Sequence, residues 1–189
     1  MLGNGEYRTT VIVAVVKNGK VYVGADSAGV SRDDLAISSR RDTKVFVKDN
    51  FIIGFTSSFR MGQILKYSLN CPKQKKKQTD EEFMCTTFVD HVQSLFKKKG
   101  YGTIELNEQN GGTFIVGYKG TIYTIEDDFQ VAIQYENYAA VGCGSKIALG
   151  SLYACNAYKF NPENAITMAL KAAENFSAGV RNPFIIKSL

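Results

Sequence analysis

The first strongly apolar part of the chain consists of two β-branched stretches separated by a short polar interruption. Residues 10–16 are almost all small or β-branched, and residues 21–26 resume the apolar run after four polar or small positions. Asn18-Gly19 lies between the two stretches, and this dipeptide is a strong signal for a two-residue hairpin turn. The pattern therefore predicts a β-hairpin over residues 10–26.

A second pair of β-rich stretches follows at 44–47 and 51–56. Lys48-Asp49-Asn50 joins them, and Asp and Asn favour tight turns because their side chains bond to nearby backbone groups. Apolar and β-branched residues on either side of such a turn are typical of paired strands. The pattern predicts a second hairpin here.

Four further segments are predicted to be helices. The first two carry apolar side chains at the spacing of one helix face, and the third is rich in alanine and leucine. Asn70-Cys71-Pro72 ends the first of them, since proline disfavours helical backbone before it. Thr79-Asp80-Glu81-Glu82 resembles a capping box that begins the second, and Gly100 ends it. The fourth has proline in its first turn, where it is expected. The predicted helices span 58–69, 79–99, 145–158 and 162–176.

Strand character returns between the second and third predicted helices and once more near the end of the chain. We expect the first four of these later strands to form a second sheet. Their apolar residues run consecutively, which indicates that both faces of each sheet are covered, and helices must cover the outer faces. This predicts an α+β fold, for which a four-layer αββα sandwich is one of several arrangements. The expected later strands span 112–118, 121–125, 131–133, 138–142 and 184–187.

Length and composition favour one domain without a membrane segment. The 189 residues, 44% of them hydrophobic, suffice for one substantial core. The first residues lack the basic and apolar regions of a signal peptide, and no later run could span a bilayer. We therefore expect a soluble, cytoplasmic protein. Its cysteines follow neither a zinc pattern nor a disulfide framework, so we expect reduced thiols at Cys71, Cys85, Cys143 and Cys155.

The formal net charge of +5 comes mainly from lysine clusters. These clusters contain neither the arginine nor the interleaved aromatic residues that phosphate pairing and base stacking use. We interpret them as solvated loop and helix-end side chains, and expect neither a nucleic-acid nor a membrane partner. The lysines concerned are Lys73, Lys75, Lys76, Lys77, Lys97, Lys98 and Lys99.

The stretch TTVIVAVVKNGKVYVGADSAG, residues 9–29, resembles the start of a mature proteasome β-subunit or of the related bacterial proteasome-like peptidase. In both, a threonine opens the first strand, a glycine-containing hairpin follows, and an aspartate ends the second strand. Thr10, Gly19 and Asp26 match these positions in register. The resemblance implies a fold of the N-terminal-nucleophile hydrolase type, with two mainly antiparallel sheets between helix layers.

The resemblance extends over most of the chain. Lys44-Val45-Phe46 is similar to the family's lysine segment, and the strand ending at 54–58 is similar to the one before its oxyanion loop. Gly142-Cys143-Gly144-Ser145 before an alanine-rich helix resembles the family's Gly-Ser-Gly turn. The order and spacing of these elements are more specific than any one of them, and the likeness is greatest to short members encoded by bacteria and phages.

The resemblance implies a threonine nucleophile at Thr10. A threonine hydroxyl needs a base, and in this class its own free α-amine, which titrates near about 8, serves as one. A buried ammonium would favour the deprotonated hydroxyl, which implies Lys44, and Asp26 would pair with Lys44 and fix its position. Taken singly, each of the three would be an ordinary strand or strand-end residue.

Other positions match the family's supporting groups less closely. The backbone of Ser57 or Ser58 takes the place of the family's oxyanion donor. Cys143 stands where the family's Gly-Ser-Gly turn has its supporting serine, and Ser145 follows two positions later. Ser177 is a possible stand-in for the serine that the family has late in the chain. A Cys-His enzyme is disfavoured because His91, the chain's one histidine, falls within a helix. We expect no metal and no cofactor.

Thr10 could act only after residues 1–9 are removed, and the family's self-cleaving members usually have glycine where this chain has Thr9. We therefore expect a leader over 1–9 and one proteasome β-like domain over 10–189. The first hypothesis is a threonine peptidase that acts on peptides or proteins as a homo-oligomeric ring, with any ATPase partner left open.

The alternative hypothesis is an inactive protein of the same fold that serves in assembly or partner binding. Its contacts would lie on helix faces rich in phenylalanine, although a buried core is the commoner use of aromatic residues at helical spacing. The residues concerned are Phe83, Phe88 and Phe96.

Overall fold

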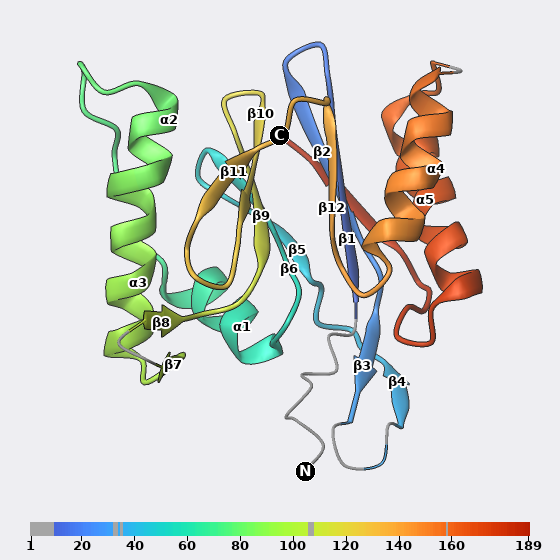
Figure 1. Ribbon diagram of the computed structural model, residues 1–189, viewed down its shortest axis with the longest axis horizontal. Helices are drawn as coiled ribbons and strands as arrows, with labels where there is room; N and C mark the ends of the chain where they lie inside the picture. Colours follow the sequence, from blue (N-terminus) through green and yellow to red (C-terminus); the bar gives the residue numbers. More distant parts are fainter. Residues whose placement is uncertain (1–9, 32–33, 35, 106–107, 158) are drawn as a thin grey trace.

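Two β-sheets pack face to face between two layers of helices (Figure 1). The computed structural model describes residues 10–31, 34, 36–105, 108–157 and 159–189, of which 103–105 and 108 are described by backbone alone. The expected leader over 1–9 lies outside the described residues, as does Tyr158 at the end of the third predicted helix. The expected α+β fold is confirmed, and so is its four-layer αββα arrangement.

The first sheet has four strands in the order β12-β1-β2-β13, each antiparallel to its neighbours. Asn18 and Gly19, in the turn between β1 and β2, have φ values of 53° and 72°. Two successive positive φ values are typical of the type I′ hairpin turn that Asn-Gly favours. The strands are β1 (Val11–Lys17), β2 (Lys20–Ala25), β12 (Tyr138–Gly142) and β13 (Ile185–Ser188).

The second sheet has five strands in the order β11-β10-β9-β6-β5, again antiparallel throughout. The turns of the β5–β6 and β9–β10 hairpins lie at Asp49-Asn50 and Lys119-Gly120, between the strands that the sequence predicts. The strands are β5 (Val45–Lys48), β6 (Phe51–Phe55), β9 (Phe114–Tyr118), β10 (Thr121–Ile125) and β11 (Val131–Ile133).

The expected grouping of strands into sheets is wrong. We expected the four strands over 112–142 to form one sheet, but β12 leaves the other three and pairs with β1. The two opening hairpins also separate, because β6 pairs with β9 instead of joining the sheet of β1 and β2. Turn residues determine pairing within a hairpin, whereas pairing between distant strands depends on packing that a local pattern does not contain.

Two small hairpins were not predicted. One pairs β3 (Ala28–Val30) with β4 (Ile37–Ser39), and the other pairs β7 (Thr103–Glu105) with β8 (Glu108–Asn110). Strands of three residues are too short to show a recognisable alternation. The β3–β4 hairpin projects beyond the four-stranded sheet at the end where β1 begins (Figure 1).

The helices cover the outer faces of both sheets, as the consecutive apolar strands predicted. Residues of β1 divide between two cores: Val11 and Val13 pack with α4 and α5, while Ile12 and Ala14 pack against the second sheet. Successive side chains of a strand point to opposite faces, so a strand buried on both faces is apolar throughout. The helices are α1 (Phe59–Ser68), α2 (Asp80–Glu82), α3 (Val89–Lys98), α4 (Ser145–Ala157) and α5 (Pro162–Phe176).

The second predicted helix contains an unexpected π-helical segment, η1 (Phe83–Phe88), between α2 and α3. Phe83 and Phe88 are five residues apart, which places them on one face of a π-helix. Both rings pack beside Phe51, with centroid distances of 6.3 and 5.2 Å. Together with Phe96 they are fully buried, so the suggestion that these phenylalanines contact a partner is wrong.

Candidate functional site

Thr10 lies directly before β1, and its backbone is held in an uncommon conformation. The residue is buried, and its φ of 100° is one that a β-branched residue adopts only under strain. Its N–H donates to the carbonyl oxygen of Gly179 at 3.0 Å. Its own carbonyl oxygen lies against Gly142, where an added Cβ would come within 2.2 Å of it. Glycine is therefore required at position 142 for Thr10 to lie where it does.

Asp26 follows β2 and is a hydrogen-bond acceptor for three different segments. One carboxylate oxygen accepts from the N–H of Val11 at 3.0 Å. The other accepts from the N–H groups of Ala28 at 2.9 Å and Arg181 at 3.3 Å. The side chain is fully buried, and hydrogen bonds to a buried carboxylate are among the stronger ones in proteins. Asp26 thus joins the start of β1 to the segment after α5.

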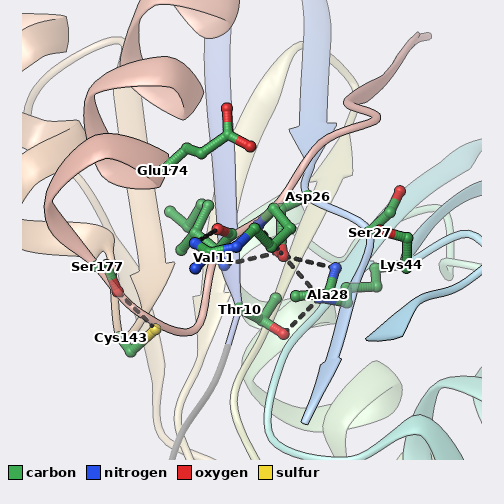
Figure 2. A network of polar contacts seen from close by, with 12 residues as sticks. Thr10, Val11, Asp26, Ser27, Ala28, Lys44, Cys143, Glu174 and Ser177 are labelled. Carbon is green, nitrogen blue, oxygen red and sulfur yellow. Dashed lines mark hydrogen bonds and ion pairs between the residues drawn. The ribbon is translucent and has the colours of Figure 1, made fainter. Parts of the chain in front are cut away.

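Lys44 lies directly before β5 and joins the two sheets at the site (Figure 2). Its Nζ lies 2.6 Å from Oγ1 of Thr10 and 2.9 Å from Oδ1 of Asp26. The lysine side chain is only 1% exposed. The structure therefore brings Thr10, Asp26 and Lys44 together, and the expected pairing of Asp26 with Lys44 is present.

Burial lowers the pKa of Lys44, because taking an ammonium out of water disfavours its charged form. The charge of Asp26 and its hydrogen bond act in the opposite direction, and the nearby positive charge of Arg40 adds to the lowering. In its charged form Lys44 can donate to the Thr10 hydroxyl and stabilise a developing alkoxide. In its neutral form it can accept a proton instead.

The two serines proposed for the oxyanion site have different roles in the fold. Ser58 is the N-cap of α1, its Oγ accepts from the N–H of Arg60, and its own N–H donates to Thr56 at 2.6 Å. Ser57 has a φ of 62°, and its Oγ accepts from the N–H of Thr113 at 3.2 Å. Among the described residues the Ser57 N–H has no hydrogen-bond acceptor, so Ser57 is the better candidate for an oxyanion donor.

Cys143 and Ser177 form a pair beside Thr10, on the side of α4 and α5 (Figure 2). Their Sγ and Oγ atoms are 3.3 Å apart, and Ser177 lies two residues before Gly179, which accepts from the Thr10 N–H. Ser145 is the half-buried first residue of α4, and its hydroxyl bonds to no other described residue. The structure therefore brings Cys143 and Ser177 to the site and leaves Ser145 at its edge.

Glu174 is a site residue that the sequence reasoning missed. Its carboxylate accepts from the N–H of Asn182 at 2.8 Å and so closes the loop after α5. That loop carries both Gly179 and Arg181, the backbone partners of Thr10 and Asp26. The sequence signal for Glu174 was its position in the last turn of the predicted helix over 162–176, three residues before the candidate Ser177.

Phe59 and Arg40 were also missed. The guanidinium carbon of Arg40 lies 3.8 Å from the centre of the Phe59 ring, and Lys44 Nζ lies 5.6 Å from the same centre. Arg40 also binds Asp42 through two hydrogen bonds of 2.8 and 2.6 Å. The Phe59 ring therefore packs against the exposed Arg40 and also lies near the buried ammonium of Lys44. No local pattern marked it, because the contacts join residues almost twenty positions apart.

No described helix is both long and apolar enough to cross a bilayer. Histidine, cysteine, aspartate and glutamate side chains in the described ranges form no group of three or more that could hold a metal ion.

Comparisons with known proteins give matches among solved structures alone, since no family model and no curated protein matches the chain. BPH of Thiobacillus denitrificans has a TM-score of 0.78 and 20% identity, covering 95% of this chain and 97% of that one. The same protein in complex with epoxomicin has a TM-score of 0.77 and 19% identity, covering 95% of this chain and 98% of that one. Eukaryotic HslV from Trypanosoma brucei has a TM-score of 0.66 and 16% identity, covering 95% of this chain and 99% of that one.

These likenesses span almost the whole of both chains. At 16–20% identity they show the fold and leave the chemistry of individual residues open. The resemblance to proteasome-like peptidases is thereby confirmed at the level of the fold, as is the N-terminal-nucleophile type of αββα sandwich.

Proposed function

From a proteasome-like fold in which Thr10 opens β1, we propose that the protein is a threonine-type N-terminal-nucleophile peptidase. The observation that carries the proposal is the 2.6 Å contact between Lys44 Nζ and Thr10 Oγ1 in a buried site. Burying an ammonium costs free energy, and an apolar side chain would fill the same space at less cost. A buried lysine on a threonine hydroxyl is therefore better explained by chemistry at that hydroxyl than by stability.

Processing comes first in this proposal, with residues 1–9 as the leader and 10–189 as the domain. Thr10 Oγ1 attacks the carbonyl carbon of Thr9 and the C–N bond to Thr10 breaks. The proton of the hydroxyl passes to the Thr10 nitrogen, and the acyl group remains on the oxygen as an ester. Water then hydrolyses the ester and leaves a free α-amine on Thr10. The strained φ of Thr10 supports this step, because breaking the peptide bond relieves the strain.

Peptide cleavage repeats the same chemistry on a substrate. The α-amine takes the proton from Oγ1, which attacks the substrate carbonyl while the Ser57 N–H and the Lys44 charge stabilise the negative oxygen. The leaving amine takes the proton, and water hydrolyses the acyl-enzyme. Asp26 keeps Lys44 in position. No cofactor or metal is needed for any step.

Cys143 and Ser177 support the α-amine in this proposal. The Thr10 nitrogen lies against Gly179, in the same loop as Ser177, so a free amine there would have both the Gly179 carbonyl and this polar pair nearby. We propose no direct role for Ser58, which caps α1, and only a structural one for Ser145 at the start of α4.

The proposed protein works as a homo-oligomeric ring in the cytoplasm and cleaves peptides or unfolded proteins. The fold of BPH and HslV supports the assembly, since this chain covers nearly their whole length. Large exposed aromatic side chains on the α4–α5 layer, Tyr153 and Phe176, support it further, because side chains of this kind are often covered by another subunit.

A second candidate is an inactive protein that keeps the fold for assembly. The cysteine at position 143 favours it, because the resemblance places a serine there. The same exposed aromatic residues of α4 and α5 would then be its main working surface. It differs from the first candidate in requiring no cleavage before Thr10.

Intact mass measurement and a peptidase assay separate the two candidates. We expect the mature protein to lose residues 1–9, to cleave fluorogenic peptides, and to gain the mass of one epoxomicin molecule on Thr10. Thr10→Ala should abolish all three results. Thr167→Ala, which alters a half-buried threonine of α5 whose hydroxyl bonds only to the carbonyl oxygen of Glu163 among the described residues, should abolish none. A wild-type protein that stays uncleaved, inactive and unlabelled would leave the assembly role standing.

A further inference from the structure

A cavity of about 460 Å³ opens at the end of the sandwich opposite Thr10. It lies between the β1–β2 turn and the connection from α4 to α5. Strand β1 joins the two places, and its seven residues span roughly 20 Å at about 3.3 Å per residue. Figure 1 shows this turn at the far end of β1 from the β3–β4 hairpin. We call this cavity the distal pocket.

The distal pocket has an apolar floor. Leu152 and Cys155 of α4 and Ala165 of α5 line it and are buried. Val15 of β1, which packs with the same core, completes the floor on the side of the sheet. A ligand that fills the pocket would therefore place a hydrocarbon portion against these side chains.

The rim of the distal pocket is polar and positively charged. Two lysines, Lys17 and Lys159, line it together with three asparagines, and no acidic side chain is among the described lining residues. Among the described residues the Lys17 ammonium has only one weak contact, 3.5 Å from the Phe160 carbonyl oxygen. Most of its donor capacity is therefore available to a ligand. The asparagines are Asn18, Asn137 and Asn156.

We propose that the distal pocket binds an apolar chain that ends in a carboxylate. Its volume falls within the range of small-molecule sites, about 300–1,000 Å³. The apolar part would cover the floor, and the carboxylate would accept hydrogen bonds from the two lysines, which are stronger than neutral ones. The proposal does not depend on Thr10, because the pocket shares no residue with that site.

A tryptophan at the rim provides a direct measurement. The chain contains no tryptophan, so Asn156→Trp, at an exposed position, introduces a single fluorescent reporter. Titration with decanoate should change its fluorescence with a dissociation constant at least about tenfold below that of decanol. Decylamine should not bind, because its ammonium would face the two lysines.

Charge removal tests the rim. In the reporter protein, Lys17→Gln with Lys159→Gln should weaken decanoate binding at least about tenfold and leave decanol binding unchanged. Lys97→Gln with Lys98→Gln is the matched control, since these lysines are exposed at the far end of α3. Amide shifts of Gly19 in wild-type protein give the same comparison without the tryptophan.

Two further probes distinguish a free aliphatic acid from the carboxyl end of a peptide. N-acetyl-leucyl-leucine that binds more tightly than decanoate would identify a peptide terminus, and the reverse order a free acid. The amide of the same dipeptide should not bind. Equal binding of decanoate and decanol, or no binding of any carboxylate at about 10 mM, would overturn the proposal. Repeating the titration in Thr10→Ala keeps this result separate from the peptidase question.

Discussion

The hydroxyl of Thr10 is within hydrogen-bond distance of an ammonium that solvent barely reaches. The Asp26 carboxylate, 2.9 Å away, favours the charged form of Lys44 against the effect of burial, and Asp26 is in turn held by three backbone N–H groups. Each of the two side chains therefore depends on the other. At the scale of single residues, the site is a buried Lys44–Asp26 ion pair whose lysine is hydrogen-bonded to the Thr10 hydroxyl.

Removing one partner of this pair should cost more stability than removing both. Asp26→Asn leaves the Lys44 ammonium buried without a counter-charge, and we expect a loss of about 3–5 kcal/mol in the free energy of unfolding. Adding Lys44→Met should recover part of that loss, because no unpaired charge then remains. Urea denaturation measures both. Equal losses in the single and double variants would contradict this account.

The pH dependence of peptidase activity should reflect the lowered pKa of Lys44. The proposed mechanism needs a neutral Thr10 α-amine, which sets the acid limb, and a charged Lys44, which sets the alkaline limb. Because burial lowers the pKa of Lys44, its charge is lost below the usual value of about 10.4. The value of kcat/KM, determined from initial rates, should therefore begin its alkaline decline below about pH 10.4.

Activity that stays level through pH 10.5 in a folded protein would contradict this assignment. Circular dichroism at each pH provides the control for unfolding.

The resemblance to proteasome-like peptidases pointed to Thr10, Asp26 and Lys44 and implied that the lysine ammonium is buried. The backbone N–H groups that hold Asp26 needed the structure, because two of them, from Val11 and Arg181, belong to segments distant in sequence. The choice between Ser57 and Ser58 also needed the structure, because only there does the Ser58 N–H prove to be bonded to Thr56. Local sequence indicates which groups are present, and the fold decides which of them have partners.

At the scale of elements, the site depends on the close approach of β12 to the start of β1. Gly142 ends β12 and pairs with Val11, and its α-carbon lies beside the Thr10 carbonyl. This contact orients the peptide unit of Thr10, on which both processing and catalysis depend in the proposed function. A side chain at position 142 would act on the nucleophile without touching its hydroxyl.

Gly142→Ala should therefore impair both stability and processing. An added Cβ would come within 2.2 Å of the Thr10 carbonyl oxygen at a φ of 99°, so we expect a loss of at least about 2 kcal/mol. Gly150→Ala is the matched control. It lies in α4 with open space around it and should gain about 0.5–1 kcal/mol. Thermal unfolding and intact mass would show the two effects.

A Gly142→Ala protein that is as stable as the wild type and still loses residues 1–9 would show that the close approach is unimportant.

The element boundaries themselves were largely predictable, because turns, caps and helical spacing are local. The π-helical turn at η1 was not predictable, because it depends on the packing of Phe83 and Phe88 beside the Phe51 ring of β6, which is distant in sequence.

At the scale of the whole molecule, the two helix layers differ in what they expose. Tyr153 of α4 and Phe176 of α5 are 71% and 73% exposed, whereas the phenylalanines of the α2–α3 layer are buried. An exposed aromatic side chain on its own is unremarkable, but two on one layer favour an interface. The α4–α5 layer is therefore the surface by which we expect subunits to associate.

Assembly can be tested by mass. Wild-type protein should sediment well above the 20.9 kDa of one chain, and Tyr153→Glu with Phe176→Glu should yield smaller species. Tyr67→Glu is the control, because Tyr67 is similarly exposed but lies on α1 in the opposite layer. A monomeric wild-type protein, or dissociation caused equally by the control, would argue against this surface.

The sequence by itself determined the hairpins, the helices and their order, together with the threonine, aspartate and lysine at family-like spacing. These features depend on interactions between residues near one another in the chain, which turn and helix signals reveal directly. Only the tertiary structure decided that β12 joins β1, that Lys44 is buried on the Thr10 hydroxyl, and that Gly142 holds the Thr10 carbonyl. Each of these joins segments distant in sequence, and their contacts depend on how the two sheets pack.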